Sequence, residues 1–249
     1  MTTFQAPASP PEAPEGGATA APPAPAGRRG LSGLQIAVLV AAMAFLGAAV
    51  GFVVGQRSES DPLSATDVGY LQDMGYHHEQ AVQMSLLLLD KEGIDRTLRS
   101  FAQEIIIDQR YEQGVFVATL DRFGHDTSAG DTVMGWMGEA QPIEDMVGIA
   151  TDAQIEELRA AEGTEAEALW IALMSEHHLA GLHMADWEAR HGHDRTVVNL
   201  AKATVKNQRS EVLDIDRYRR SHDIPIPDGF GDPTQDQRLN PLSFTDPGD

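Results

Sequence analysis

The stretches MGYHHEQAVQM, residues 74–84, and MSEHHLAGLHM, residues 174–184, decide the fold because they repeat one pattern with identical spacing. Each begins and ends with Met and carries a His-His pair between the two methionines. At 3.6 residues per turn, all four positions fall on one side of a helix. We therefore predict two related helices that each present a His/Met face, with a small residue, Ala81 or Gly181, at its centre.

Each of these helices is followed by a second helical stretch that contains its own repeat. Gln109 and Glu112 lie on an otherwise apolar stripe in the first half, and Gln208 and Glu211 do so in the second. Burying such groups costs a few kcal/mol each unless they find partners. We expect the His pairs to be those partners, with both His faces pointing into the protein.

Capping residues and helix breakers give the expected boundaries of these helices. Four long helices are predicted, together with a short one from residue 151 to 163, and the sequence shows no persuasive alternating strand pattern. The long helices are expected at residues 66–89, 95–123, 164–191 and 194–221. This order predicts an all-α protein, an antiparallel four-helix bundle made of two helical hairpins.

The rest of the chain divides by composition. Residues 1–30 are rich in Pro and Ala and predict a disordered tail, and residues 31–56 predict a transmembrane helix. The bundle is expected over residues 64–222, with repeat halves 64–124 and 164–222 and a connector at 125–163. Residues 223–249, rich in Pro and Asp, predict an extended or disordered tail.

The apolar run from Leu34 to Val54 sets the expected topology. Arg28 and Arg29 precede it and only Arg57 follows closely, so the positive-inside rule places residues 1–30 in the cytoplasm. The bundle is then extracytoplasmic, on a single-pass protein of the cell membrane. A cleaved signal peptide is the alternative, because residues 47–49 (Gly-Ala-Ala) offer a possible cleavage site.

Charge and cysteine content exclude several function classes. The formal net charge is −20, and the chain contains no Cys. An acidic domain does not bind nucleic acid by neutralising phosphates, although it can attract cations. The lack of Cys excludes disulfides, thiolate metal sites and a lipidated cysteine anchor.

The repeated pattern itself points to a metal, because imidazole and thioether together favour copper, and Cu(I) above all. The proposed ligands are Met74, His77, His78, Met84, Met174, His177, His178 and Met184, with Gln109, Glu112, Gln208 and Glu211 orienting them. The alternative is a structural core network, in which polar groups bonded to one another specify the packing. A metal site predicts that one ring nitrogen of each His is held by protein and the other is free, whereas a core network predicts that all are bonded.

These motifs resemble those of the family known as domain of unknown function 305. The resemblance covers residues 64–222 and rests on the His-His pairs, the flanking methionines and the Gln-x-x-Glu motif that follows in each half. It implies a ferritin-like four-helix bundle in an exported bacterial protein, and some members are associated with copper. This chain departs from the Met-rich members, because its connector contains few methionines.

Further His and Met residues have weaker assignments. In the connector, Met134, Met137 and Met146 could pass on Cu(I), but we favour a packing role together with Trp136, because Met often fills irregular gaps. His183 is expected to point away from the His/Met face. The connector also contains His125.

Glu188-x-x-His191 has the spacing of a ferritin-type di-iron motif, but the first half has no counterpart. His191, His193 and His222 are therefore expected to be exposed. The sequence shows no phosphate-binding loop and no recognisable nucleophile.

Taken together, these patterns predict a membrane-anchored, extracytoplasmic copper-binding protein that is not an enzyme. Its expected partners are the metal ion, the membrane and either a membrane complex or a copper-handling protein. The alternatives are a metal-free structural or interaction module and a ferritin-like metal oxidase.

Overall fold

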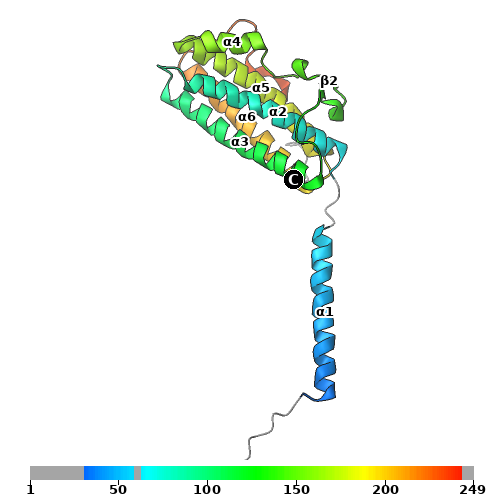
Figure 1. The fold of residues 1–249 in the computed structure, drawn as a ribbon. Coiled ribbons are helices and arrows are strands. Elements are labelled where there is room, and N and C mark those ends of the chain that lie inside the picture. Colours follow the sequence, from blue (N-terminus) through cyan, green and yellow to red (C-terminus); the bar gives the residue numbers. More distant parts are fainter. Residues whose placement is uncertain (1–30, 59–62, 243–249) are drawn as a thin grey trace, which may run out of the picture. The chain divides into compact units, whose positions relative to one another are not determined.

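The computed structural model describes residues 31–58 and 63–242, which form two separate units divided after Ser58. The predicted disordered, cytoplasmic segment 1–30 lies outside the described residues. The N-terminal unit is one helix, α1 (Gly33–Ser58) (Figure 1). Its segment Gly33–Phe52 is long and apolar enough to cross a membrane, and it could equally serve as a signal sequence.

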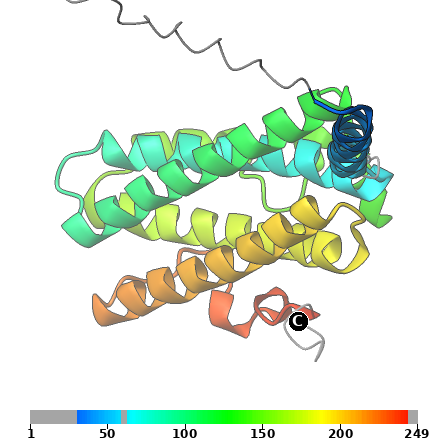
Figure 2. The same cartoon turned by 90° about the horizontal axis from the view of Figure 1, so that it is seen from below.

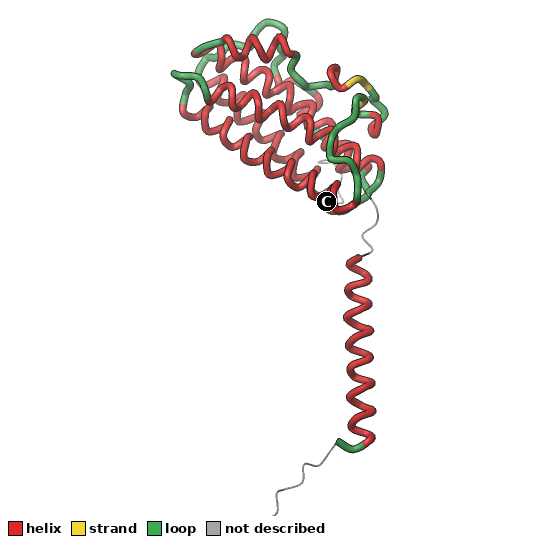
Figure 3. Tube along the Cα trace, viewed as in Figure 1, coloured by secondary structure: helices red, strands yellow, loops and turns green. Residues whose placement is uncertain are grey.

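Four long helices build the second unit (Figures 1 and 3). They are α2 (Ala65–Leu89), α3 (Arg96–Phe123), α5 (Gly163–His191) and α6 (Arg195–Ser221). The predicted boundaries are confirmed to within a residue or two. The reason is that the caps are strong. Ser64 and Asp67 form a capping box, Asp95 and Asp194 cap α3 and α6, and Gly124 ends α3 in the left-handed conformation.

Contacts at the helix ends fix the directions of the helices. Close to the start of α5, Glu167 accepts a hydrogen bond from the backbone of Asp95, so this end lies beside the end of α2. At the opposite end, Asp67 near the start of α2 accepts bonds from the backbone of His193 and Asp194. Helices α2 and α5 are therefore antiparallel, α3 and α6 pair with them in the same way, and the unit is an antiparallel helical bundle (Figure 2).

The connector between α3 and α5 wraps over one side of the bundle. It contains β1 (Thr132–Val133), η1 (Gly135–Met137), β2 (Gln141–Pro142), η2 (Ile143–Asp145) and α4 (Asp152–Ala160). The short helix was expected, and Thr151 caps it. The antiparallel two-residue strands were not expected, because two residues are too few to show an alternating pattern.

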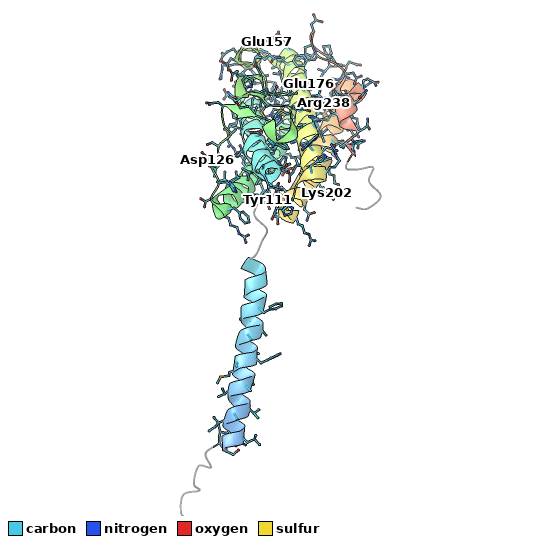
Figure 4. All side chains as sticks on the ribbon, turned by 90° about the vertical axis from the view of Figure 1, so that its right-hand side faces the viewer. Tyr111, Asp126, Glu157, Glu176, Lys202 and Arg238 are labelled. Atoms are coloured by element: carbon cyan, nitrogen blue, oxygen red, sulfur yellow. The ribbon has the colours of Figure 1, made fainter. Side chains whose placement is uncertain are left out.

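The C-terminal segment differs from the predicted extended or disordered tail. Residues 223–242 fold back on the bundle and include η3 (Pro233–Gln235) and η4 (Gln237–Leu239). Arg238 pairs with Glu176 of α5, as the two labelled side chains in Figure 4 show, and Arg209 donates to the Leu239 carbonyl. Buried Ile224 and Leu239 add apolar contact, so a few anchors hold a polar, Pro-rich segment in place. Residues 243–249 lie outside the described part.

Two apolar clusters form the core of the bundle. One contains Met84 and Met174 and extends to α4, and the other contains Met74 and Met184 and extends to the connector. None of the four His residues of the motif belongs to either cluster. The core is therefore interrupted by a polar layer.

Candidate metal centre

The polar layer is formed by the His pairs of α2 and α5. His77, His78, His177 and His178 are all fully buried, as are the four motif methionines. The prediction that both His faces point into the bundle is confirmed. The helical period explains this, since each face shares its side of the helix with residues of the apolar core.

The second His of each pair, His78 or His178, is called the outer His here. One carboxylate from the following helix holds each of them. His78 Nε2 lies 2.7 Å from Glu112 Oε2 of α3, and His178 Nε2 lies 2.8 Å from Glu211 Oε2 of α6. The expected pairing of each His helix with the Gln-x-x-Glu of its own half is therefore present. A carboxylate accepts a hydrogen bond, so Nε2 carries a proton, and in the neutral tautomer of the ring Nδ1 keeps a lone pair.

The inner residues His77 and His177 stack on each other where α2 crosses α5. Their ring centroids lie 3.6 Å apart at an interplanar angle of 27°. Burial lowers the pKa of both imidazoles well below the usual value, and the other His residues of the layer lower it further. Both rings are therefore neutral, and His177 Nε2 donates to the His77 carbonyl at 2.7 Å.

Several ring nitrogens in this layer have no hydrogen-bond partner. Nδ1 is unpartnered on His78, His177 and His178, and both ring nitrogens are unpartnered on His77. A buried polar group without a partner typically costs about 1–3 kcal/mol. The His layer therefore does not satisfy the core-network expectation that every ring nitrogen is bonded to protein.

The amides of Gln109 and Gln208 are also buried without partners, on both the oxygen and the nitrogen. Gln208 lies against Gly181, where an added Cβ would come within 2.2 Å of the Gln208 Oε1 atom. Gly181 thus provides the close approach expected of the small residue at the centre of the face. The two Gln residues face inward as predicted, but they do not bond the imidazoles.

The methionines flank the His layer on either side. Met84 of α2 shares a cluster with Met174 of α5, and Met74 shares the other with Met184. Each methionine is thus grouped with one from the other repeat, because the helices run antiparallel. Among the residues that the structure describes, no three His, Asp or Glu side chains are arranged as a ready metal site.

The comparisons with known proteins agree with this architecture. The model of the family described as domain of unknown function (DUF305) matches residues 67–219. The chain belongs to the DUF305 family. A DUF305 protein from Streptomyces coelicolor is 31% identical, with a TM-score of 0.60 over 65% of this chain and 96% of that one. Nothing among the curated proteins matches the chain.

Two further solved structures are similar to this DUF305 domain. A fragment from Deinococcus radiodurans is 26% identical, with a TM-score of 0.54 over 65% of this chain and 99% of that one. A protein named CopM, solved in a Cu(I)-bound form, is 19% identical, with a TM-score of 0.48 over 64% of this chain and 99% of that one. The last likeness is too low to carry an argument about ligands.

Motif analysis missed two residues of the DUF305 His layer. Thr204 of α6 donates to Glu112 Oε1 at 3.0 Å, and the buried Tyr70 hydroxyl lies 3.4 Å from the Thr204 hydroxyl. This makes a hydrogen-bonded chain from Tyr70 to His78. The only signal in the sequence was that Thr204 occupies a polar position on the apolar stripe of α6.

The weaker assignments are settled by burial. Met134, Met137 and Met146 are buried against the bundle, and Trp136 donates to Asp73, which confirms their packing role. His183 points away from the layer toward Glu139, as expected. His125, His191, His193 and His222 are exposed.

The two residues of the ferritin-type motif, Glu188 and His191, lie in different environments. Glu188 is fully buried beside Asp67, while exposed His191 stacks on Trp187. Burial raises the pKa of Glu188 to about 9, and the neighbouring Asp67 contributes. Glu188 is therefore protonated at neutral pH, which does not suit a metal ligand.

Proposed function

We propose that this DUF305 protein binds copper in its buried His layer and is not an enzyme. The observation that supports this best is the pattern of ring nitrogens. On His78, His177 and His178, one nitrogen is held by a carboxylate or carbonyl and the other has no hydrogen-bond partner. That is how metal-ligating imidazoles are usually oriented.

The ligand types favour Cu(I). Neutral imidazole and thioether bind it well, and the chain offers no thiolate. The described residues hold no group of three His, Asp or Glu side chains arranged around one point, so binding through imidazoles alone would need the rings to rotate or shift. We propose that the inner His77 and His177 rings and one flanking methionine supply the remaining ligands.

A structural or interaction module without metal is the second candidate. It is favoured by the bonds that the layer already makes between helices, such as His78–Glu112 and His178–Glu211. It leaves the unpartnered ring nitrogens and Gln amides unexplained. A metal oxidase is disfavoured because Glu188 is buried with a raised pKa while His191 is exposed.

Thermal unfolding of the full chain in non-ionic micelles, with and without Cu(I), separates these two functions. Copper at about 100 times its Kd stabilises a folded protein by about 2.7 kcal/mol. For a domain of this size the melting temperature should rise by roughly 5–10 °C. The rise should shrink in His77→Ala/His78→Ala and persist in the control His125→Ala/His191→Ala, which removes two exposed imidazoles.

Two outcomes would count against copper binding in the His layer. An unchanged wild-type melting temperature at saturating Cu(I) would favour the structural module. A rise that the double variant retains would move the site away from the His layer.

The Gln109→Ala variant tests the structural module without copper. If the Gln109 amide has no partner, the variant should be as stable as the wild type or more stable. If the amide belongs to a hydrogen-bonded core network, the variant should be less stable.

We further propose that α1 is a membrane anchor and that the bundle is extracytoplasmic. Arg28 and Arg29 before α1 support this orientation. Protease added to wall-stripped cells should digest the part after residue 60 and spare an N-terminal tag. Protection of the bundle would reverse the orientation, and absence of residues 31–49 from the mature protein would indicate a cleaved signal peptide.

A further inference from the structure

Helices α2 and α3 lie side by side (Figures 1 and 2), and a hollow opens between them next to the His layer. Its volume is about 310 Å³, enough for several water molecules. Buried Leu71 and Phe116 line its inner side, together with Gly75, and half-exposed Val117 lies at its edge. Solvent therefore reaches inward along this seam, although the His layer itself is fully buried.

Hydrogen bonds hold the rim of this hollow in place. On one side, Gln113 of α3 donates to the Gly75 carbonyl at 2.9 Å and to Glu79 at 3.3 Å, so it ties α3 to α2. On the other side, Gln72 donates to the Asp126 carbonyl at 2.7 Å and holds the start of the connector over the hollow. The hollow is thus a built feature of the seam and is bounded by specific contacts.

A single aromatic ring lies between the hollow and the His layer. The fully buried Phe116 ring lines the hollow, and its centroid is 5.5 Å from that of His78. Gly75 lies one turn before His78 on α2, and a Cβ there would meet the Phe116 ring at 3.8 Å. A rotation of one side chain is a smaller rearrangement than the separation of two packed helices. An ion in the hollow therefore has only this ring to pass.

The internal repeat supplies a comparison for this hollow. It matches the α2 residues of the hollow with residues of α5, namely Leu71, Gln72, Gly75 and Tyr76 with Ile171, Ala172, Ser175 and Glu176. The α5 residues line a hollow too, but Ile226, Pro227 and Pro233 of the C-terminal segment occupy its other side. About 10 Å³ remains there, room for about one water molecule. Of these two equivalent hollows, only the one in the first half is open.

The group behind the Phe116 ring has the chemistry to take up a soft cation. Glu112 holds Nε2 of His78, and Nδ1 of the same ring has no hydrogen-bond partner. The ring face of Phe116 also attracts a cation that has lost part of its water shell. An ion that passes this ring therefore meets favourable partners on both sides of the step.

We propose that copper enters and leaves the His layer through the α2–α3 hollow, passing the Phe116 ring to reach His78. The inference rests on the proposed copper function and adds the route. Phe116 and Val117 lie along the path and take no part in coordination. Substitutions at these two positions should therefore change the rate of loading and leave the amount of bound metal unchanged.

Rapid mixing of the full chain in non-ionic micelles with Ag⁺, a redox-inert substitute for Cu(I), tests the route in chloride-free nitrate buffer. Tryptophan fluorescence follows loading, and metal analysis gives the stoichiometry. Val117→Phe places a larger side chain over the hollow, and we expect it to lower the second-order rate constant roughly threefold to tenfold. The matched control is Ala118→Phe, which adds the same ring at the next exposed position of α3, outside the hollow.

The opposite change should open the path. Phe116→Leu replaces the ring by a smaller side chain and should speed loading. Its control is Phe101→Leu, which makes the same exchange on α3 in the other apolar cluster. Faster loading in both Leu variants would point to loosened packing of α3 and would overturn the role of the Phe116 ring.

The filling variant decides the route itself. Loading by Val117→Phe at the rate of Ala118→Phe would overturn the route, while wild-type binding would leave the copper function intact. A smaller final amount of metal in Val117→Phe would make the hollow part of the binding site and would overturn the route as well. A wild-type chain that takes up neither Ag⁺ nor Cu(I) would overturn the function and the route together.

Discussion

The two halves of the His layer share their motif but differ in their surroundings. In the first half, Glu112 bonds both His78 and Thr204, and Tyr70 extends the chain. In the second half, Glu211 bonds His178 alone, and its side chain is 24% exposed, against 11% for Glu112. The repeat places Trp170 and Ile105 where the other half has Tyr70 and Thr204.

The difference shows what an internal repeat preserves. The helices, the His positions and the carboxylate partners are all duplicated, because together they specify the backbone packing. The neighbours that determine polarity and access are not duplicated. Two equivalent metal sites therefore do not follow from two equivalent motifs, and under the proposed copper function the two halves should bind and exchange metal differently.

The largest expected effect concerns Glu188, which the repeat matches with buried Leu88. Its pKa is raised to about 9, so its contribution to stability is full below about pH 4.5 and is lost as the pH rises toward 9. His77 and His177 act oppositely, because their pKa values are lowered. The unfolded chain therefore takes up more protons than the folded one below about pH 6.5.

The free energy of unfolding should accordingly be highest near pH 6.5. Each shifted group contributes a slope of at most about 1.4 kcal/mol per pH unit, so up to about 3 kcal/mol is lost by pH 9. Denaturant unfolding across this range, followed by circular dichroism, measures the curve. Glu188→Gln should remove the loss of stability above pH 6.5 and keep the loss of stability below it. A variant that still lost stability at alkaline pH would assign that loss to other groups.

The second effect contrasts the two carboxylates directly. Glu112→Ala leaves buried His78 Nε2 without its acceptor and removes the Thr204 bond, so we expect a loss of about 2–3 kcal/mol. Glu211→Ala should cost only about 1 kcal/mol, because water can reach that position. Denaturant unfolding of the metal-free protein gives both values, with Glu104→Ala as an exposed control on α3. Equal losses would remove the asymmetry between the halves.

Much of the fold follows from the sequence, and less of the site does. Strong caps such as Ser64 and Gly124 make the helix ends readable, and the helical period places the His faces inside. The stacking of His77 on His177 depends on how α2 crosses α5, which no local pattern contains.

The local sequence pattern also did not predict the folded tail or the short strands of the connector. Residues 223–242 have the composition of a disordered segment, but Arg238 and buried Leu239 hold them against the bundle. Such anchoring depends on where Glu176 and Arg209 lie on the finished surface. Composition describes the segment as a whole, whereas these few tertiary contacts hold it in one conformation against the bundle.

The third effect concerns the small residues at the centres of the two faces. Gly181→Ala would drive a methyl group into Gln208, and overpacking of this kind costs about 1–3 kcal/mol. Part of this is offset by the better helix propensity of Ala, about 1 kcal/mol, so a net loss of roughly 1 kcal/mol is expected. Combining Gly181→Ala with Gln208→Ala should restore stability. If the double variant were as unstable as Gly181→Ala, the clash would lie elsewhere.

The smallest effect should come from Tyr70→Phe, which removes a hydroxyl from the chain that ends at His78. The bond to Thr204 is long, at 3.4 Å, and Thr204 can still donate to Glu112, so the expected loss is only about 0.5–1 kcal/mol. The variant changes only the first half of the His layer, because the second half has Trp170, which has no hydroxyl, at the equivalent position. In nitrogen-15 NMR of the imidazole groups, the His78 Nε2–H signal should shift, because the charge distribution on Glu112 changes. The His178 signal should stay in place. Equal shifts of both signals would mean that the stacked His77 and His177 rings couple the halves, which would then act as one site.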